Sequence, residues 1–193
     1  MASPTVVNPL AFGAMVTTLI MSRGTRAARR FASGTAILLL AAGLCGAGTE
    51  TAPIPIAVLE FDYLDTSGEI RDQSATHSAL LEQFATTLRN DLQASRRYQV
   101  VSMSCEVDPC SIMQTDPSQL LEAARRAGAR LLLFGGVHKM STLVQWAKAQ
   151  VVEVETDKLV FDRLLTFRGD DEGAWRHAEG FLAKELISQP LAP

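Results

Sequence analysis

The sequence lacks the short motifs that mark common catalytic sites. It contains no G-x-S-x-G, S-x-x-K or H-E-x-x-H pattern, so it carries none of these nucleophile or metalloprotease signatures. The stretch FGGVHK (134–139) is not a phosphate-binding loop, because it lacks the G-K-[ST] ending and does not open onto a helix. We therefore expect no catalytic residue and no cofactor, and we favour a non-enzymatic protein over an enzyme.

Cysteine is also scarce, with three residues in the chain. Cys105 and Cys110 are separated by four intervening residues, which include Pro109, and this allows their Cα atoms to come within bridging distance. No second cysteine pair or nearby histidine completes a tetrahedral metal site, so we expect no metal. Redox centres favour the shorter C-x-x-C spacing. In an oxidising compartment the pair favours a structural disulfide, with a redox role as the alternative.

Acidic residues are absent before Glu50, and this part of the sequence has the pattern of an export signal. Four arginines lie in 21–30, an apolar run follows at 31–44, and the small residues of CGAGTE come next. This order predicts a signal peptide over residues 1–47, with translation starting at Met21. The alternative is a transmembrane anchor over 31–49, but Gly, Ser and Thr dilute that run.

Cys45 leaves a second alternative open for the mature protein. The stretch AAGLC resembles a lipobox, although Leu44 is larger than the small residue that a lipobox requires. Cleavage after Ala47 predicts a periplasmic protein, whereas a lipid on Cys45 predicts a membrane-anchored lipoprotein. The chain would otherwise meet the membrane only through an uncleaved signal.

Basic residues are too few in the mature chain for a nucleic-acid-binding protein. Four of the 18 lie in the predicted signal, whereas all 21 acidic residues lie at or after Glu50. Phosphate binding requires clustered Lys and Arg. We therefore expect neither a nucleic acid nor an anionic lipid surface as the partner.

Hydrophobic patterns predict one α/β domain over residues 48–193. Apolar runs and helical spacing alternate in the order β-α-β-α-β-β-β-α, which gives a mixed sheet with helices packed on it. Asp116 and Gly128 are the clearest boundary signals, as the N-cap and the stop of the middle helix. The predicted strands are 54–61, 97–103, 130–137, 142–155 and 158–169, and the predicted helices are 75–95, 117–127 and 172–187.

Three stretches carry a resemblance to known proteins: IPIAVLEFDYLDTSGE, the run from LLEAARRAGARLLLFGGV to LLTFRGD, and AWRHAEGFLAKEL. They resemble a bacterial family of exported proteins with a domain of unknown function. More distantly, the layout is similar to the amino-terminal domain of the periplasmic Tol-system protein TolB and to curli-secretion-type lipoproteins. This resemblance implies an α/β module that binds envelope proteins, and it implies no catalytic residue.

A few residues remain as candidates for a site. His138 follows the predicted central strand, and Asp62 and Asp65 follow the first strand, where ligands of open α/β sheets bind. His77 and His177 lie in first helical turns and are expected in solvent. Trp146 lies on the hairpin, where it is either a core residue or an aromatic anchor for a partner on an exposed sheet face.

Two hypotheses for function follow. The first is an exported, non-enzymatic module of the cell envelope that binds or helps to assemble other proteins. The second is a small periplasmic ligand-binding protein or enzyme that uses Asp62, Asp65 and His138. The second predicts a concave pocket at His138.

Overall fold

The computed structural model describes residues 52–106, 110–189 and 191. The predicted signal peptide (1–47), the start at Met21 and the lipidation of Cys45 lie outside these residues and stay predictions. Within the described residues, no helix combines the length and the apolar character needed to cross a membrane.

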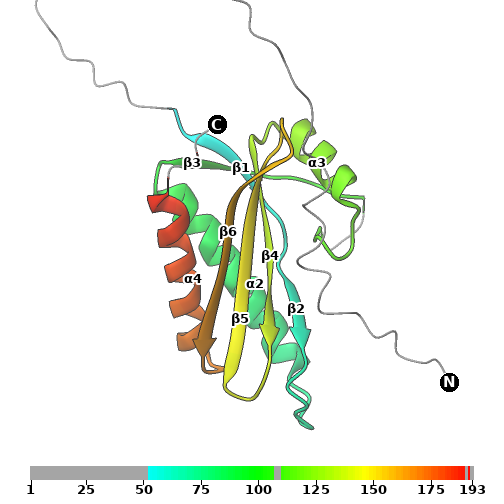
Figure 1. Cartoon of the computed structure of the whole chain (residues 1–193), viewed down its shortest axis with the longest axis vertical. Coiled ribbons are helices and arrows are strands. Elements are labelled where there is room, and N and C mark those ends of the chain that lie inside the picture. Colours follow the sequence, from blue (N-terminus) through cyan, green and yellow to red (C-terminus); the bar gives the residue numbers. More distant parts are fainter. Residues whose placement is uncertain (1–51, 107–109, 190, 192–193) are drawn as a thin grey trace, which may run out of the picture. The chain divides into compact units, whose positions relative to one another are not determined.

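A six-stranded mixed sheet forms the centre of the domain (Figure 1). The strand order is β3-β1-β4-β5-β6, and β2 pairs with β4 as well. Pairings among β1 to β4 are parallel, whereas β4, β5 and β6 form an antiparallel meander, as predicted. The strands are β1 (Ile54–Val58), β2 (Asp62–Asp65), β3 (Tyr98–Val101), β4 (Leu131–Lys139), β5 (Val144–Glu153) and β6 (Lys158–Arg168).

Two helices, α2 (Ser74–Ala94) and α4 (Glu172–Ser188), cover one face of the sheet, which we call the inner face. Phe84 and Leu88 of α2 and Trp175 and Leu182 of α4 belong to the same buried cluster as the inner-face residues of the strands. Those strand residues include Leu131, Leu133, Val137, Ala147, Ala149, Val151, Phe161 and Phe167.

The third helix, α3 (Pro117–Arg126), covers the opposite face at one end only (Figure 1). Its predicted boundaries are confirmed: the Asp116 side chain accepts a hydrogen bond from the Ser118 N–H at 2.9 Å, and Gly128 has a φ of +74°. Leu120 of α3 packs in a second cluster with Leu132 of β4. The remaining part of this face, over β2 and the far ends of β4, β5 and β6, is the outer face.

The predicted first strand, 54–61, ends earlier in the structure, at Val58, and a separate strand that was not predicted, β2, begins at Asp62. One extra residue lies between the two strands. Val58 of β1 pairs with Leu133 of β4, and Asp62 of β2 pairs with Gly136 of β4. The segment from 58 to 62 is therefore one residue longer than the segment of β4 that it follows. Glu60 lies in this interval, and its carboxylate is 2.7 Å from the Arg89 guanidinium. The insertion behaves like a β-bulge and resets which residues of β2 face outward.

Candidate functional site

Two rows of paired residues cross four strands on the outer face. Cα pairing places Leu64 of β2 beside His138 of β4, His138 beside Trp146 of β5, and Trp146 beside Thr166 of β6. The second row is Asp62, Gly136, Lys148 and Leu164. We call these eight residues the outer patch. Trp146 is 37% exposed and Leu164 is 53% exposed, so the patch presents apolar surface to solvent.

His138 supports Trp146 within the outer patch. The two rings pack edge to face with their centroids 5.9 Å apart, and His138 Nε2 lies 2.8 Å from the Thr66 hydroxyl oxygen. Burial lowers the pKa of His138, and the negative charge of Asp65 opposes this only in part. The neutral ring is therefore the favoured form near pH 7, and it fixes one side of the indole.

The structure separates the two acids that the sequence grouped with His138. Alternation along β2 puts Asp62 on the outer face, whereas Asp65 pairs with Lys139 of the inner-face row. Burial raises the pKa of Asp62. Burial alone would also raise the pKa of Asp65, but hydrogen bonds from Ser67 outweigh it and lower that pKa. In the part of the chain that is described, no group of three or more His, Cys, Asp or Glu side chains is arranged to hold a metal ion.

Two glycines of β4 allow the neighbouring chains to approach closely. A Cβ on Gly135 would lie 2.1 Å from the Lys148 carbonyl oxygen, and one on Gly136 would lie 2.8 Å from the Asp62 carbonyl oxygen. Contacts this short exclude any side chain without a shift of the backbone. The FGG stretch is thus a packing feature of the sheet.

Sequence reasoning missed a buried polar cluster on the inner face, centred on Lys139. This side chain is fully buried at the end of β4. Its Nζ donates to the Gln73 amide oxygen at 3.0 Å, to Asp170 Oδ2 at 2.5 Å and to the Glu69 carboxylate. Burial alone would lower the pKa of Lys139, but hydrogen bonds to the two carboxylates reverse this and raise it.

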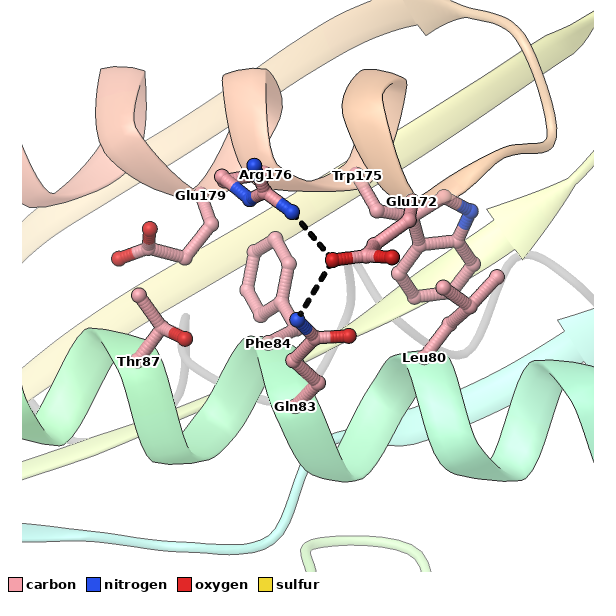
Figure 2. Close-up of a pocket in the computed structure, with 8 residues that line it drawn as sticks. All are labelled: Leu80, Gln83, Phe84, Thr87, Glu172, Trp175, Arg176 and Glu179. Carbon is pink, nitrogen blue, oxygen red and sulfur yellow. Dashed lines mark hydrogen bonds and ion pairs between the residues drawn. The ribbon is translucent and has the colours of Figure 1, made fainter.

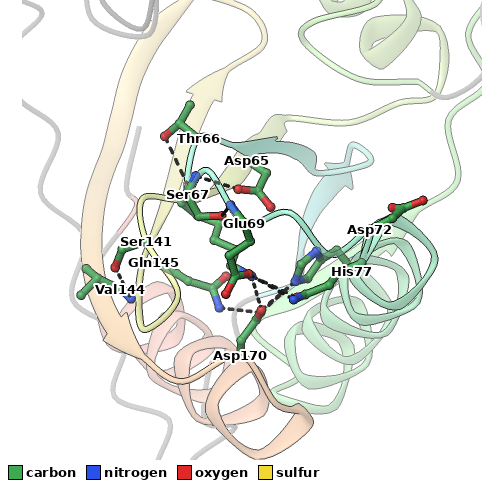
Figure 3. A network of polar contacts seen from close by, with 12 residues as sticks. Asp65, Thr66, Ser67, Glu69, Asp72, His77, Ser141, Val144, Gln145 and Asp170 are labelled. Atoms are coloured by element: carbon green, nitrogen blue, oxygen red, sulfur yellow. Dashed lines mark hydrogen bonds and ion pairs between the residues drawn. The ribbon is translucent and has the colours of Figure 1, made fainter.

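Asp170 is the second centre of the same cluster (Figure 3). His77 Nε2 lies 2.9 Å from both carboxylate oxygens, and the Gln145 amide donates to Asp170 Oδ1 at 2.9 Å. Burial alone would raise the pKa of Asp170, but hydrogen bonds from Lys139 and His77 hold it below its ordinary value. The cluster ties β4, β5, α2 and the segment before α4 together.

The placement of His77 corrects the expectation that it lies in solvent. It is buried, and its ring stacks on Tyr63 with a centroid distance of 4.8 Å. The reason is Asp170, which is 93 residues away in sequence and supplies the hydrogen-bond partner that a buried histidine needs. His177 is exposed, as predicted.

A small pocket lies between α2 and α4 (Figure 2). Its volume is about 10 Å³, which is room for about one water molecule. Glu179 lines it, and burial together with the nearby charge of Asp91 raises the pKa of this carboxyl to about 7. Among the described residues, neither Glu179 Oε1 nor the Trp175 indole N–H has a hydrogen-bond partner. The pocket is too small for an organic ligand.

Cys105 and Cys110 lie at disulfide distance, with their Cα atoms 5.5 Å apart. Both pack against the second core cluster, next to α3. The Cys110 carbonyl oxygen accepts a hydrogen bond from the Glu60 N–H at 3.0 Å. A bond between the two sulfurs would therefore fix this loop against the junction of β1 and β2.

The fold and these clusters define an α/β domain with a mixed sheet. A family model described as "Protein of unknown function (DUF2380)" matches residues 55–187. The chain therefore belongs to this family, DUF3280, as the sequence resemblance predicted. None of the curated proteins matches the sequence significantly.

Solved structures show only distant similarity. The C-terminal domain of LpoB from Salmonella enterica has 18% identity and a TM-score of 0.44, over 62% of this chain and 85% of that one. TolB from Acinetobacter baumannii has 15% identity and a TM-score of 0.43, over 70% and 28% of the two chains. Lipoprotein GNA1162 from Neisseria meningitidis has 15% identity and a TM-score of 0.43, over 72% and 99%. At these scores the similarities support no function for this chain.

Proposed function

We propose that this chain is an exported, non-enzymatic module of the cell envelope that binds an apolar segment of another envelope protein on the outer patch. The carrying observation is Trp146, which lies with its ring partly exposed in a row across four strands. In the described part of the chain, the helices that pack on this region of the sheet lie on the inner face. Aromatic residues so placed are the usual anchors of protein interfaces.

The surroundings of Trp146 support a preformed surface. His138 holds one side of the ring, and neighbouring charges are paired with one another, since Lys148 Nζ lies 3.3 Å from the Asp162 carboxylate. A partner would therefore cover the indole without first breaking an ion pair. Export is supported by the charged, apolar and small-residue order of the first 47 residues.

The enzyme or ligand-binding alternative finds less support in the geometry. Asp62 and Asp65 point to opposite sides of β2, so they do not converge on His138. The best-organised polar groups, around Lys139 and Asp170, are bonded mainly to one another within the fold. We therefore put the binding module first.

The test compares two exposed aromatic residues on different sides of the domain. Trp146→Ala should leave the fold intact and greatly reduce the crosslinked partners that the exported wild-type protein forms in its own host. Phe181→Ala is the matched control, because Phe181 is 46% exposed on α4 and lies outside the outer patch. It should keep those partners.

Partners would be quantified by mass spectrometry after crosslinking in intact cells, with circular dichroism as the check on folding. If a folded Trp146→Ala protein captures the same partners at wild-type levels, the proposed interface is wrong. Loss with both variants equally would also contradict it.

A further inference from the structure

β6 forms an open edge of the sheet. It has 11 residues and is the last strand in the order, and within 52–106, 110–189 and 191 it pairs with β5 alone. Among the described residues, β6 has no backbone hydrogen bond to any partner other than β5. A strand edge of this length carries a row of free N–H and C=O groups that another strand can pair with.

The regular part of β6 limits how such a strand can align. Val151 pairs with Phe161 and Val152 with Leu159, so Val160 is an extra residue that breaks the regular edge. The regular stretch is therefore 161–168. In an antiparallel pair, residues directly opposite each other lie on the same face of the sheet. For two copies of β6 this requires that one residue lies directly opposite the same residue of the second copy, with the twofold axis midway between them.

Registers with the axis at Leu164 or Leu165 pair the most residues within 161–168, and charge decides between them. An axis at Leu164 would set Asp162 against Thr166 of the second copy. An axis at Leu165 sets Asp162 against Arg168 of the second copy, twice by symmetry, and sets Leu164 against Thr166 of the second copy.

We propose that two copies of this chain pair antiparallel along β6, with the twofold axis at Leu165. The side chains that would meet are available on the outer face. Asp162 keeps 44% of its side chain exposed although it contacts Lys148, and Leu164 is half exposed. Arg168 is exposed, and it has no ion-pair partner among the described residues. Pairing joins the two sheets and brings two outer patches onto one continuous face.

This inference is independent of the proposed partner-binding role, because it concerns the strand edge and a second copy of the chain. Opposite charges on paired strands stabilise a sheet, and like charges destabilise it. Asp162→Arg alone places Arg against Arg at both positions. Arg168→Asp alone places Asp against Asp at both positions, and it leaves the contact between Lys148 and Asp162 in place.

The experiment measures self-association of the purified exported protein by sedimentation velocity over a range of concentrations. The wild-type chain should dimerise, and each single variant should have a dissociation constant raised roughly ten-fold or more. An equimolar mixture of the two variants should recover wild-type affinity as a heterodimer, because both cross-strand pairs are then opposite in charge. Lys158→Glu is the control, since Lys158 lies outside the regular stretch, and it should dimerise like the wild type.

Two results would overturn the inference. One is a wild-type protein that stays monomeric at the highest concentration tested. The other is a dimer that neither charge reversal weakens, which would place the contact elsewhere. If Asp162→Arg fails to fold, Arg168→Asp alone still decides, because a folded variant with unchanged affinity contradicts the register.

Discussion

Glu179 is a buried acid whose ionisation should destabilise the fold. Its side chain is 2% exposed between α2 and α4, and its pKa is raised to about 7 by burial and by the nearby Asp91 carboxylate. The ordinary value is 4.5. The folded protein therefore holds this proton more tightly than the unfolded chain does.

The sign and the size follow from that difference. Below pH 4.5 the carboxyl is protonated in both states, and it imposes no penalty. As the pH rises from 4.5 towards 7, unfolding releases a proton, so the free energy of unfolding falls. Above pH 7 the penalty is complete, and the gap between the two pKa values corresponds to about 3 kcal/mol.

The variant Glu179→Gln removes the titration and keeps the shape. Its free energy of unfolding should equal that of the wild type near pH 4 and exceed it by up to about 3 kcal/mol near pH 8. Urea unfolding followed by fluorescence measures this directly, because the buried Trp175 lines the same pocket. The control is Glu82→Gln, which removes an exposed carboxylate from α2. A difference between Glu179→Gln and wild type that does not change with pH would refute the reasoning.

Two more predictions concern the polar cluster and the amino terminus. Lys139→Met should lower the free energy of unfolding by about 3 kcal/mol, because it leaves the partly buried Asp170 carboxylate without the Lys139 cation. Lys148→Met, on the outer face, should lower it by at most about 1 kcal/mol in the same urea titration. The intact mass of the exported protein without reductant should match a chain starting at Gly48 and lighter by two hydrogens for the disulfide. A start at Cys45 with acyl chains would show a lipoprotein instead, and free thiols would contradict the disulfide.

Local patterns were sufficient to predict most of the fold. The helix expected over 75–95 is Ser74–Ala94, and the second hairpin strand expected over 158–169 is Lys158–Arg168. These elements carry their own periodicity and end signals, so no distant contact is needed to find them. Strand alternation along 142–155 also puts Trp146 on the opposite face from Ala147, Ala149 and Val151, and the structure has this arrangement.

Features that depend on distant partners could not be predicted in this way. The Glu60 insertion is visible only once β1 and β2 are both paired with β4. The apolar periodicity of the last helix puts Phe181 on one face with Trp175, but Phe181 is exposed in the structure. The face in contact with the core is a narrow stripe through Trp175, Ala178, Leu182 and Leu186. Its width is set by the packing of α2 and the sheet, which no local window contains.

The buried cluster shows why chemical character alone misleads in this chain. Lys139, Asp170, His77 and Glu69 are the residue types of an active site, yet their polar atoms are bonded to one another where four segments meet. Their mutual hydrogen bonds offset the desolvation cost of burying them, whereas removing one leaves another without its partner. Trp146 has no comparable structural requirement for its exposed surface, since His138 already packs against its ring. An exposed tryptophan that the fold does not need is better explained by a partner than by stability, which is why the outer patch and not the polar cluster is the surface to test for function.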